Sequence, residues 1–521
     1  MGAARAVVTA ASAGSLTVTV PSGATFQPIT VTTGGLTARS ALGFMLTYPA
    51  GNPEIYTSAF AGRQDQKTLS QDVPQSTLAA DIDGDGRPDI VNTTTGAFFF
   101  SVYRNLGGGS APAYFDTGTN FNMLQYTMAT AVGDIDGDGR LDVVITNQTT
   151  STISVFRNTS SPGTISFDPV MTIPCGVVTA AHLAIGDLDG DGKPEVVLTN
   201  DTKIVILKNN SVPGTIQLDS ATSVDVSQAT DVAINDFDGD GKADIVVPYW
   251  GGRTSSGLLF LLNTSSPGSF SFVAQPTLDV LIDGVEPLIG DMDGDGRPDL
   301  GFTSYSIPAI TLFRNTSTVG SISFETQPNI RTSAQAINLS LGDIDGDGLP
   351  EITAVIRSTG YNKNDTVVIL KNKSTPGNLS YSPKLDLVTQ PVTASAFIAD
   401  IDGDGKPDVV SGQRATGKSL SVFRNRDNEP FIRSFLPATA FSGSVVTLKG
   451  VSFTGATAIS FGGVAAASFT VVNDSTLTAT VAGGGKSGDI LVTTGYGTFS
   501  IPGFEWKTAE TPVISSLSPM S

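Results

Sequence analysis

The chain has 521 residues, of which 40% are apolar and 15% are charged, and its formal net charge is −19. This length exceeds one ordinary domain and favours two to four, while the apolar content is sufficient for packed cores. The acidity argues against a nucleic-acid partner, and no stretch reaches the roughly 18 to 20 apolar residues of a membrane span.

The composition predicts an all-β chain. Fifty-seven glycines accompany abundant threonine, serine and valine, which is typical of many short strands joined by tight turns. The single cysteine, Cys175, cannot form an internal disulfide, so we expect a buried, small apolar side chain there. Stability must therefore come from packing or from bound metal.

From residue 81 onward one motif, D-x-D-G-D-G-x-x-[DE], occurs seven times. The copies begin at Asp81, Asp134, Asp187, Asp236, Asp291, Asp343 and Asp400, so they are 49 to 57 residues apart. An apolar run precedes each motif, a second follows it, a third ends in a turn such as Arg157-Asn158, and a fourth follows a glycine turn. Four short strands per unit in a repeated unit of this size predict the blades of a seven-bladed β-propeller over residues 49–428.

The seventh unit lacks its fourth strand, because Phe423-Arg424-Asn425 leads directly into a different type of sequence. In the other units an aromatic or apolar residue of strand four precedes the next motif by about 18 to 20 positions, and counting back from Asp81 reaches Phe60. We therefore expect residues 57–73 to supply the missing strand and close the ring, which would protect its edges. A linker without structure over residues 49–79 is the alternative.

The motif has the spacing of a calcium loop. Acidic side chains at positions 1, 3 and 5, a backbone carbonyl at position 7 and a closing acid at position 9 provide the six to eight oxygens that Ca²⁺ requires, whereas Mg²⁺ prefers smaller sites. The predicted ligands are Asp81, Asp83, Asp85, Arg87, Asp89; Asp134, Asp136, Asp138, Arg140, Asp142; Asp187, Asp189, Asp191, Lys193, Glu195; Asp236, Asp238, Asp240, Lys242, Asp244; Asp291, Asp293, Asp295, Arg297, Asp299; Asp343, Asp345, Asp347, Leu349, Glu351; and Asp400, Asp402, Asp404, Lys406, Asp408.

These loops also account for the charge. Four acids in each of seven loops are 28 of the 49 acidic residues, and seven Ca²⁺ ions would add 14 charges, which takes −19 to −5. Without metal, each loop crowds like charges and is expected to fray. We therefore predict about seven bound calcium ions that stabilise the fold by mass action.

The terminal segments have a different pattern. Residues 429–506 contain PFIRSFLPATAFSGSVVTLKGVSF, AISFGGVAA, STLTATV and DILVTTGYGTFS, which are alternating strands separated by glycine turns and predict a small sandwich. Residues 1–48 repeat the second half of this segment, with Ser15-Leu16-Thr17 approximately matching Ser475-Thr476-Leu477-Thr478. Residues 507–521 form a linker and then, from Pro512 to Pro519, repeat its opening, Pro430 to Pro437.

The seven motifs resemble those of the FG-GAP and VCBS repeat family, which includes the propellers of integrin α-subunits. The resemblance covers residues 57–428 and implies a seven-bladed propeller with calcium on one rim and an extracellular or cell-surface setting. Residues 429–506 resemble an IPT/TIG immunoglobulin-like domain. By the same resemblance, residues 1–48 are a partial IPT/TIG-like half-domain and residues 507–521 contain the first strand of a further one.

Motifs for enzyme chemistry are absent from the sequence. His182 is the only histidine and no hydrolase, zinc-protease or phosphate-binding motif occurs. Asn158, Asn209, Asn263, Asn315 and Asn372 stand in Asn-x-Ser/Thr turns, which either hairpin chemistry or glycosylation would explain. Tyr249 and Trp250 could stack on a sugar or be buried between blades.

These observations predict a non-enzymatic, calcium-binding adhesion or display module that presents a surface to a glycan or protein ligand. One alternative is a structural subunit of a fibre or array, in which the tail of one chain completes the amino-terminal half-domain of the next. A polysaccharide-acting enzyme is a second alternative. A fragment of a longer modular array would also account for the two partial domains.

Overall fold

The computed structural model describes residues 6–12, 14–21, 24, 27–34, 36–48, 59–61, 63–67, 73–95, 98–107, 114–123, 126–177, 180–250, 256–279, 287–304, 307–358, 364–382, 385–413, 419–426, 429–495 and 497–508. The chain divides into two compact units. Unit 1 comprises Met1–Ala50 and Gly62–Asn425, and unit 2 comprises Gly51–Ala61 and Arg426–Ser521.

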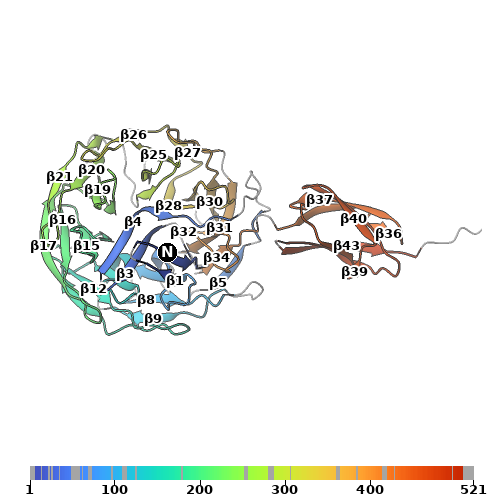
Figure 1. The fold of residues 1–521 in the computed structure, drawn as a ribbon, viewed down its shortest axis with the longest axis horizontal. Coiled ribbons are helices and arrows are strands. Elements are labelled where there is room, and N and C mark those ends of the chain that lie inside the picture. Colours follow the sequence, from blue (N-terminus) through green and yellow to red (C-terminus); the bar gives the residue numbers. More distant parts are fainter. Residues whose placement is uncertain are drawn as a thin grey trace, which may run out of the picture. The chain divides into compact units, whose positions relative to one another are not determined.

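Unit 1 is built around a ring of small antiparallel sheets (Figure 1). Among the described residues, seven such sheets of four or five strands follow one another, and we call them blades 1 to 7. Blades 1 to 3 consist of β6 (Val73–Ala80), β7 (Asp89–Thr95), β8 (Phe99–Tyr103), β9 (Thr119–Asn122); β10 (Thr127–Gly133), β11 (Asp142–Asn147), β12 (Thr152–Phe156), β13 (Met171–Pro174); and β14 (His182–Gly186), β15 (Glu195–Thr199), β16 (Lys203–Asn209), β17 (Leu218–Asp225).

The remaining blades have the same order, with two extra short strands. Blades 4 to 7 consist of β18 (Ala233–Asn235), β19 (Asp244–Trp250), β20 (Ser256–Asn263), β21 (Phe272–Ala274), β22 (Leu278–Asp279); β23 (Leu288–Gly290), β24 (Asp299–Thr303), β25 (Ala309–Asn315), β26 (Phe324–Thr326), β27 (Ile330–Arg331); β28 (Ala336–Gly342), β29 (Glu351–Ile356), β30 (Asn364–Leu370), β31 (Leu385–Pro391); and β32 (Thr393–Ala399), β33 (Asp408–Gln413), β34 (Ser419–Phe423), β5 (Gln64–Lys67).

Blade 7 joins the two ends of the ring. Its fourth strand, β5, precedes β6 in the sequence and pairs antiparallel with β34, with Lys67 opposite Ser419 and Gln64 opposite Val422. Gln66 of the same strand donates through Nε2 to the carbonyls of Phe115 and Asp116 at 2.7 and 2.8 Å, which ties blade 7 to blade 1. Residues from both ends of the ring therefore share one sheet.

The apolar cores of unit 1 lie between neighbouring blades. One cluster combines Val144 and Val155 of blade 2 with Val196 and Leu207 of blade 3, and the cluster that closes the ring combines blade 1 with blade 7. The second residue of every D-x-D-G-D-G-x-x-[DE] motif is also buried, with 0 to 1% of its surface exposed: Ile82, Ile135, Leu188, Phe237, Met292, Ile344 and Ile401. Each acidic loop is therefore anchored by an apolar side chain in the core.

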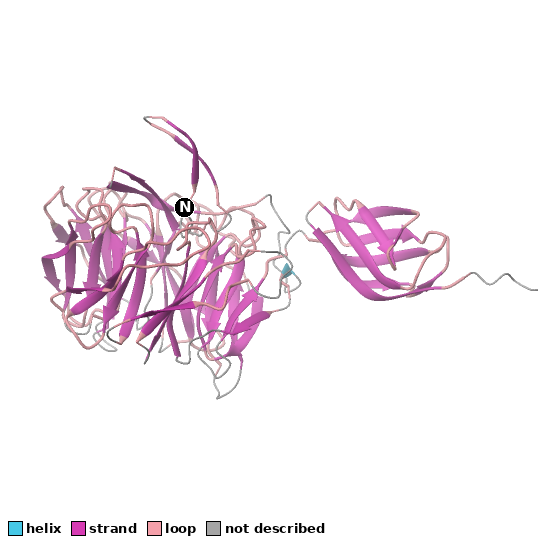
Figure 2. Cartoon of the chain, turned by 90° about the horizontal axis from the view of Figure 1, so that it is seen from below, coloured by secondary structure: helices cyan, strands magenta, loops and turns pink. Residues whose placement is uncertain are grey.

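The amino-terminal segment of unit 1 forms two hairpins, β1 (Val7–Ala11) with β2 (Leu16–Thr19) and β3 (Gln27–Thr33) with β4 (Leu36–Phe44). They lie over the ring on the side of the acidic loops (Figures 1 and 2). Thr32 Oγ1 donates to Asp134 Oδ2 at 3.2 Å, the N–H of Thr37 donates to the carbonyl of Gly192, and the Tyr48 hydroxyl donates to the carbonyl of Ile344.

Unit 2 is a two-sheet sandwich. One sheet has the order β35 (Phe431–Leu436), β37 (Val445–Val451), β41 (Thr476–Thr480), β40 (Ser468–Asn473), and the other has the order β36 (Thr439–Ala440), β43 (Gly497–Trp506), β42 (Gly488–Thr494), β38 (Ala458–Phe461), β39 (Val464–Ala465). Its core contains Val446, Leu448, Phe461, Leu477 and Val492, each at most 1% exposed. Two sheets around such a core, antiparallel except for the parallel pairing of β36 with β43, are the immunoglobulin-like arrangement.

The predicted all-β fold, with propeller-like sheets and an immunoglobulin-like sandwich, is confirmed. The predicted domain boundaries stay predictions, and most of the tail assigned as a further first strand (509–521) lies outside the described residues. No helix in the described part of the chain is long and apolar enough to cross a lipid bilayer.

Candidate metal centres

The seven acidic loops, which we number 1 to 7 from Asp81 to Asp400, each connect the first strand of a blade to its second. Loop 1 begins directly after β6 and ends at Asp89, the first residue of β7. Two glycines in each loop have positive φ, for example +75° at Gly84 and +90° at Gly86. A side chain would strain the backbone there, so the repeated D-G-D-G is the sequence requirement for this tight turn.

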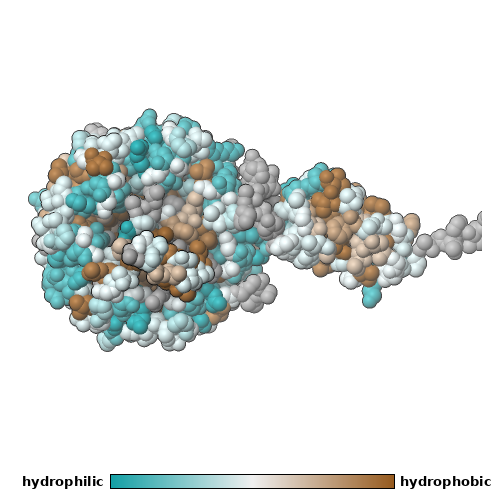
Figure 3. Space-filling view, in the orientation of Figure 1, coloured by the Kyte–Doolittle hydropathy of each residue, from teal (hydrophilic) through white to brown (hydrophobic). Residues whose placement is uncertain are grey.

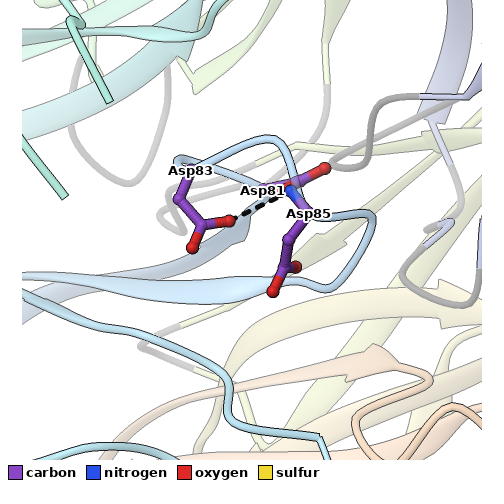
Figure 4. Close-up of side chains that lie close together, drawn as sticks. All are labelled: Asp81, Asp83 and Asp85. Atoms are coloured by element: carbon purple, nitrogen blue, oxygen red, sulfur yellow. Dashed lines mark hydrogen bonds between the residues drawn. The ribbon is translucent and has the colours of Figure 1, made fainter. Parts of the chain in front are cut away.

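Each loop brings carboxylates together. In loop 1, Asp81, Asp83 and Asp85 each place one oxygen within 4.8 Å of the others (Figure 4). Loop 5 gathers the same three positions, whereas loops 2, 3 and 4 gather positions 1, 3 and 9: Asp134, Asp136, Asp142; Asp187, Asp189, Glu195; and Asp236, Asp238, Asp244. Two further acidic groups of this kind occur among the described residues. These groups could hold metal ions.

Backbone N–H groups fix the first carboxylate of every loop. Oδ2 of the position-1 aspartate accepts the N–H of the position-6 glycine at 2.8 to 3.0 Å in all seven loops, as Asp81 does from Gly86. The N–H of position 5 likewise donates to the position-3 side chain, at 3.0 Å in loop 1. The loop conformation is thus held by the acidic side chains themselves.

The closing acid at position 9 connects the loop to the third strand of its blade. In every loop it accepts the N–H of position 2 at 2.7 to 3.0 Å, as Asp89 does from Ile82. Its other oxygen accepts the N–H of an asparagine that lies at the end of the third strand or two residues beyond it, as Asp89 does from Asn105 at 2.8 Å. The closing acids are fully buried.

Burial makes ionisation of these closing acids unfavourable. It raises the pKa of Asp89, Asp142 and Glu195 to about 8 and the pKa of Asp244 and Asp299 to about 7, and the neighbouring carboxylates of the same loop add to the increase. The pKa values of Glu351 and Asp408 are raised well above the ordinary range for the same reason. A bound cation would reverse this penalty because it stabilises the charged form.

The chain supplies part of that positive charge itself. Arg157, which ends the third strand of blade 2, contacts Asp136 at 2.6 Å and Asp138 at 2.9 Å. Basic residues at the same position contact loops 3, 5, 6 and 7: Lys208, Arg314, Lys371 and Arg424. In blade 4 this position is Leu262. Loop 4 therefore lacks the cation that its counterparts have there.

A ring of asparagines connects each loop to the next blade. Asn158 of blade 2 donates through Nδ2 to the carbonyl of Ile82 in loop 1 at 2.8 Å, and Asn105 of blade 1 donates to Ile401 in loop 7 at 3.0 Å. The equivalent bonds in the other blades are 2.7 to 2.9 Å long and are made by Asn209, Asn263, Asn315, Asn372 and Asn425. Every loop is thus held by the following blade, around the whole ring.

The glycine turns make a second connection of this kind. The N–H of Gly163 in blade 2 donates to Asp83 Oδ2 of loop 1 at 2.8 Å. The same bond, 2.6 to 2.9 Å long, joins Gly214, Gly268, Gly320 and Gly377 to the position-3 aspartates of loops 2 to 5. These residues belong to the Asn-x-Ser/Thr turns of the sequence, so the turns are parts of the acidic sites.

This geometry decides between the two interpretations of those turns. Asn158, Asn209, Asn263, Asn315 and Asn372 are at most 1% exposed. The amide nitrogen that glycosylation would modify donates two hydrogen bonds, as that of Asn158 does to Ile82 and Leu141. The folded chain therefore uses these residues for structure. The asparagine that recurs before each of these turns, after a basic residue or after Leu262, is the signal in the sequence, and it does not reveal the hydrogen-bond partner.

The ligand atoms that these acidic groups offer are carboxylate oxygens, which fits a hard cation. In loop 2, Asp134 Oδ1 is buried and has no hydrogen-bond partner among the described residues. This is expected of an oxygen that binds a metal ion. The carbonyls at position 7, from Arg87 to Lys406, stay predicted ligands, as does the complete set of ligands at positions 1, 3, 5 and 9. The single cysteine and the single histidine of the sequence lie outside the loops. Cys175 is buried, and His182 Nδ1 lies 3.3 Å from Asp231 Oδ1.

Comparison with known proteins identifies two kinds of module. The FG-GAP-like repeat matches residues 81–145, 134–198, 187–247 and 291–354, and the IPT/TIG domain matches residues 430–504. No curated protein sequence matches the chain.

Similar solved structures include BBS1N in complex with ARL6DN (TM-score 0.47, 10% identity, 70% of this chain and 96% of that chain). An Agrocybe aegerita lectin that recognises non-reducing terminal N-acetylglucosamine has a TM-score of 0.43 and 17% identity over 75% and 98% of the two chains. A fungal alcohol oxidase of the AA5 family has a TM-score of 0.44 and 10% identity over 87% and 100%. At these scores the function must be argued from the chain's own residues.

Proposed function

We propose that this chain, which combines FG-GAP-like repeats with an IPT/TIG domain, is a calcium-binding, extracellular adhesion or display module without catalytic activity. The observation that carries the proposal is the convergence of buried carboxylates in the repeated loops. Calcium is the ion that oxygen-only loops of this spacing suit best.

The proposed role of the metal is to make the ring rigid. Each loop is bonded to its own third strand through the closing acid and to the next blade through an asparagine. An ion that fixes one loop therefore also fixes the contact between two blades. A rigid ring can present a binding surface without the entropy cost of ordering it when the ligand binds.

Calcium binding is tested by titrating chelator-treated protein with CaCl2 in a calorimeter and by thermal unfolding with calcium or chelator. We expect about seven ions per chain and a large calcium-dependent rise in Tm. The double variant Asp187→Asn/Asp189→Asn should lose about one ion, whereas Asp201→Asn, an exposed acid of the same blade, should lose none. An unchanged Tm in chelator would contradict the proposal.

The proposed ligand is a glycan or a protein on a cell surface or matrix, bound by a face of the calcium-loaded ring. Immobilised glycans and matrix proteins are the probes, with calcium and chelator as the two conditions. Saturable, calcium-dependent binding without chemical change of the glycan would support an adhesion module. Turnover of a polysaccharide that survives replacement of single loops would instead identify an enzyme.

A structural subunit of a fibre or array is the second candidate, and the amino-terminal hairpins favour it. Leu16 of β2, Val31 of β3 and Val20, which follows β2, are 42, 37 and 41% exposed, and an exposed apolar patch can be an interaction site. The carboxy-terminal tail of another chain would not cover these residues by itself. Its sequence repeats β35, and in unit 2 strand β37 lies between β35 and β41. A strand formed by the tail would therefore lack the equivalent of β37 as its neighbour.

A further inference from the structure

The amino-terminal hairpins reproduce four strands of unit 2. Residues 8–44 align with residues 469–505 at a constant offset of 461, without insertion or deletion. Leu16-Thr17 corresponds to Leu477-Thr478, and the run from Val31 to Gly34 corresponds to the identical run from Val492 to Gly495. The family comparison assigns the IPT/TIG domain only to residues 430–504, so the relation rests on these residues.

Part of the strand pairing has the same register in both places, and β-bulges shift it elsewhere. Thr32 lies opposite Thr37 in the hairpin β3–β4, and Thr493 lies opposite Thr498 in the hairpin β42–β43. The two threonine hydroxyls are hydrogen-bonded in each hairpin, at 2.7 and 2.9 Å. In the other pair of hairpins, Val8 lies opposite Val18 and Phe469 lies opposite Ala479. The two segments therefore pair alike over these stretches, whereas Leu16 lies opposite Ala11 and its counterpart Leu477 lies opposite Val471.

The burial of these equivalent side chains differs. Leu477, Val481 and Val492 are at most 1% exposed in unit 2, whereas Leu16, Val20 and Val31 are 37 to 42% exposed. In unit 2 they belong to one buried apolar cluster with Ile432 of β35, Val446 and Leu448 of β37, and Ile459 and Phe461 of β38. The hairpins thus present one half of a sandwich core whose other half comes, in unit 2, from strands β35 to β38.

The acidic loops do not replace that missing half. A cavity of about 720 Å³ is lined on the hairpins by apolar side chains, among them Val18 and Ile29, and on the loops by Asp81, Asp83 and Asp134. Carboxylates cannot satisfy an apolar face, because they need hydrogen bonds or metal. Figure 3 shows apolar surface around the hairpins over the centre of the ring. An exposed apolar sheet face with open strand edges is a surface for another strand-forming polypeptide.

We infer that the apolar face of β1–β4 binds a polypeptide with the strand pattern of β35 to β38, that is, the first half of an IPT/TIG-like sandwich. The partner adds a strand beside β2 in the position of β37, as β37 lies beside β41 in unit 2, and its apolar residues cover Leu16, Val20 and Val31. Backbone pairing provides affinity and the apolar contacts fix the register. This site does not depend on the proposed calcium function.

The probe is a fluorescent synthetic peptide of residues 430–475 of this chain, titrated against the full chain in calcium, with a scrambled peptide as the control. We expect saturable binding of the first peptide only. Leu16→Asp and Val31→Asp should each weaken binding at least tenfold, because a charge would be buried against the peptide. Thr17→Asp, at an exposed position next to Leu16 on the same strand, should change binding less than twofold.

Hydrogen exchange tests the site in the unaltered chain, so its result does not depend on whether a variant folds correctly. In the unaltered chain, addition of the peptide should slow amide exchange in residues 7–44. Absence of peptide binding, binding that Leu16→Asp and Val31→Asp leave unchanged, or protection confined to unit 2 would each overturn the inference. Self-association that Leu16→Asp abolishes, without peptide binding, would overturn it as well and identify a second copy as the partner. None of these results would affect calcium binding.

Discussion

At the residue scale, the closing acids connect metal, protonation and folding. Asp89, Asp142 and Glu195 have a pKa of about 8 in the folded chain because they are buried without a full positive partner. An aspartate or glutamate in the unfolded chain has a pKa near 4. The metal-free folded state therefore binds more protons than the unfolded state between these values, and its stability falls as pH rises from about 4 to about 8.

We accordingly expect the Tm of the chelator-treated chain to fall by several degrees between pH 5 and pH 8. With excess calcium, the ion replaces the proton and the decrease should be much smaller or reversed. Differential scanning calorimetry at a series of pH values measures both curves. A metal-free Tm that rises over this range would show that the closing acids are ionised without metal.

The buried asparagines can be tested against exposed neighbours of the same type. Asn209→Ala removes a side chain that donates to the carbonyls of Ile135 and Pro194 at 2.8 and 2.9 Å, the first of these bonds being buried and the second part-buried. We expect a loss of about 2 to 4 kcal/mol in the free energy of unfolding, measured by denaturant titration. Asn210→Ala, which removes an exposed bond to Asp219, should cost less than about 0.5 kcal/mol.

At the element scale, the loops differ in the charge that surrounds them. Arg157 contacts Asp136 and Asp138 of loop 2, whereas Leu262 occupies the equivalent position at loop 4. A guanidinium group beside the loop stabilises the metal-free state and repels a divalent cation. Loop 4 should therefore bind calcium more tightly than loop 2 and be less ordered without it.

The variant Arg157→Leu makes loop 2 resemble loop 4. We expect a lower Tm in chelator, a larger rise on addition of calcium, and a severalfold gain in affinity at one site, measured by calorimetric titration. Arg140→Leu is the matched control, because the Arg140 side chain pairs with Asp138 of the same loop at 2.9 Å and is 41% exposed, whereas that of Arg157 is 17% exposed. Equal effects of the two substitutions would show that the contact of Arg157 with Asp136 has no special role.

At the scale of the whole molecule, the ring is held by contacts between segments that are far apart in the sequence. β5 pairs with β34 across more than 350 residues, and Ser421 donates to Asp65 within that pairing. The cluster that combines Tyr103 and Phe115 with Val410 and Val422 forms the adjacent apolar core. Closure of the ring thus depends on the pairing of β5 with β34 and on the apolar core between blades 1 and 7.

Gln66 tests the closure of the ring. Gln66→Ala removes the side-chain bonds to Phe115 and Asp116 that connect blade 7 to blade 1. We expect the midpoint of denaturant unfolding to fall by an amount equivalent to about 1 to 3 kcal/mol. Lys67→Ala, an exposed position on the same strand, should have little effect. A loss of stability in Lys67→Ala but not in Gln66→Ala would contradict this account of ring closure.

The sequence alone determined the fold class and the acidic pattern, because strand alternation, glycine turns and the repeated motif are local in the chain. Four runs per repeat indicated the sheets, and the spacing of Asp81, Asp83 and Asp85 indicated carboxylates that converge on one point. Local sequence is sufficient for such features, since the backbone geometry of a tight loop fixes them.

Only the tertiary structure decided what each loop touches. Asn158 and Ile82 are 76 residues apart, and Gly163 and Asp83 are 80 apart, so nothing in their local patterns reveals that they meet. The same holds for the hairpins β1–β4, whose match to unit 2 is a sequence property but whose exposed apolar face is not. Burial depends on which surfaces pack against each other, and that is settled by the arrangement of whole sheets rather than by any one strand.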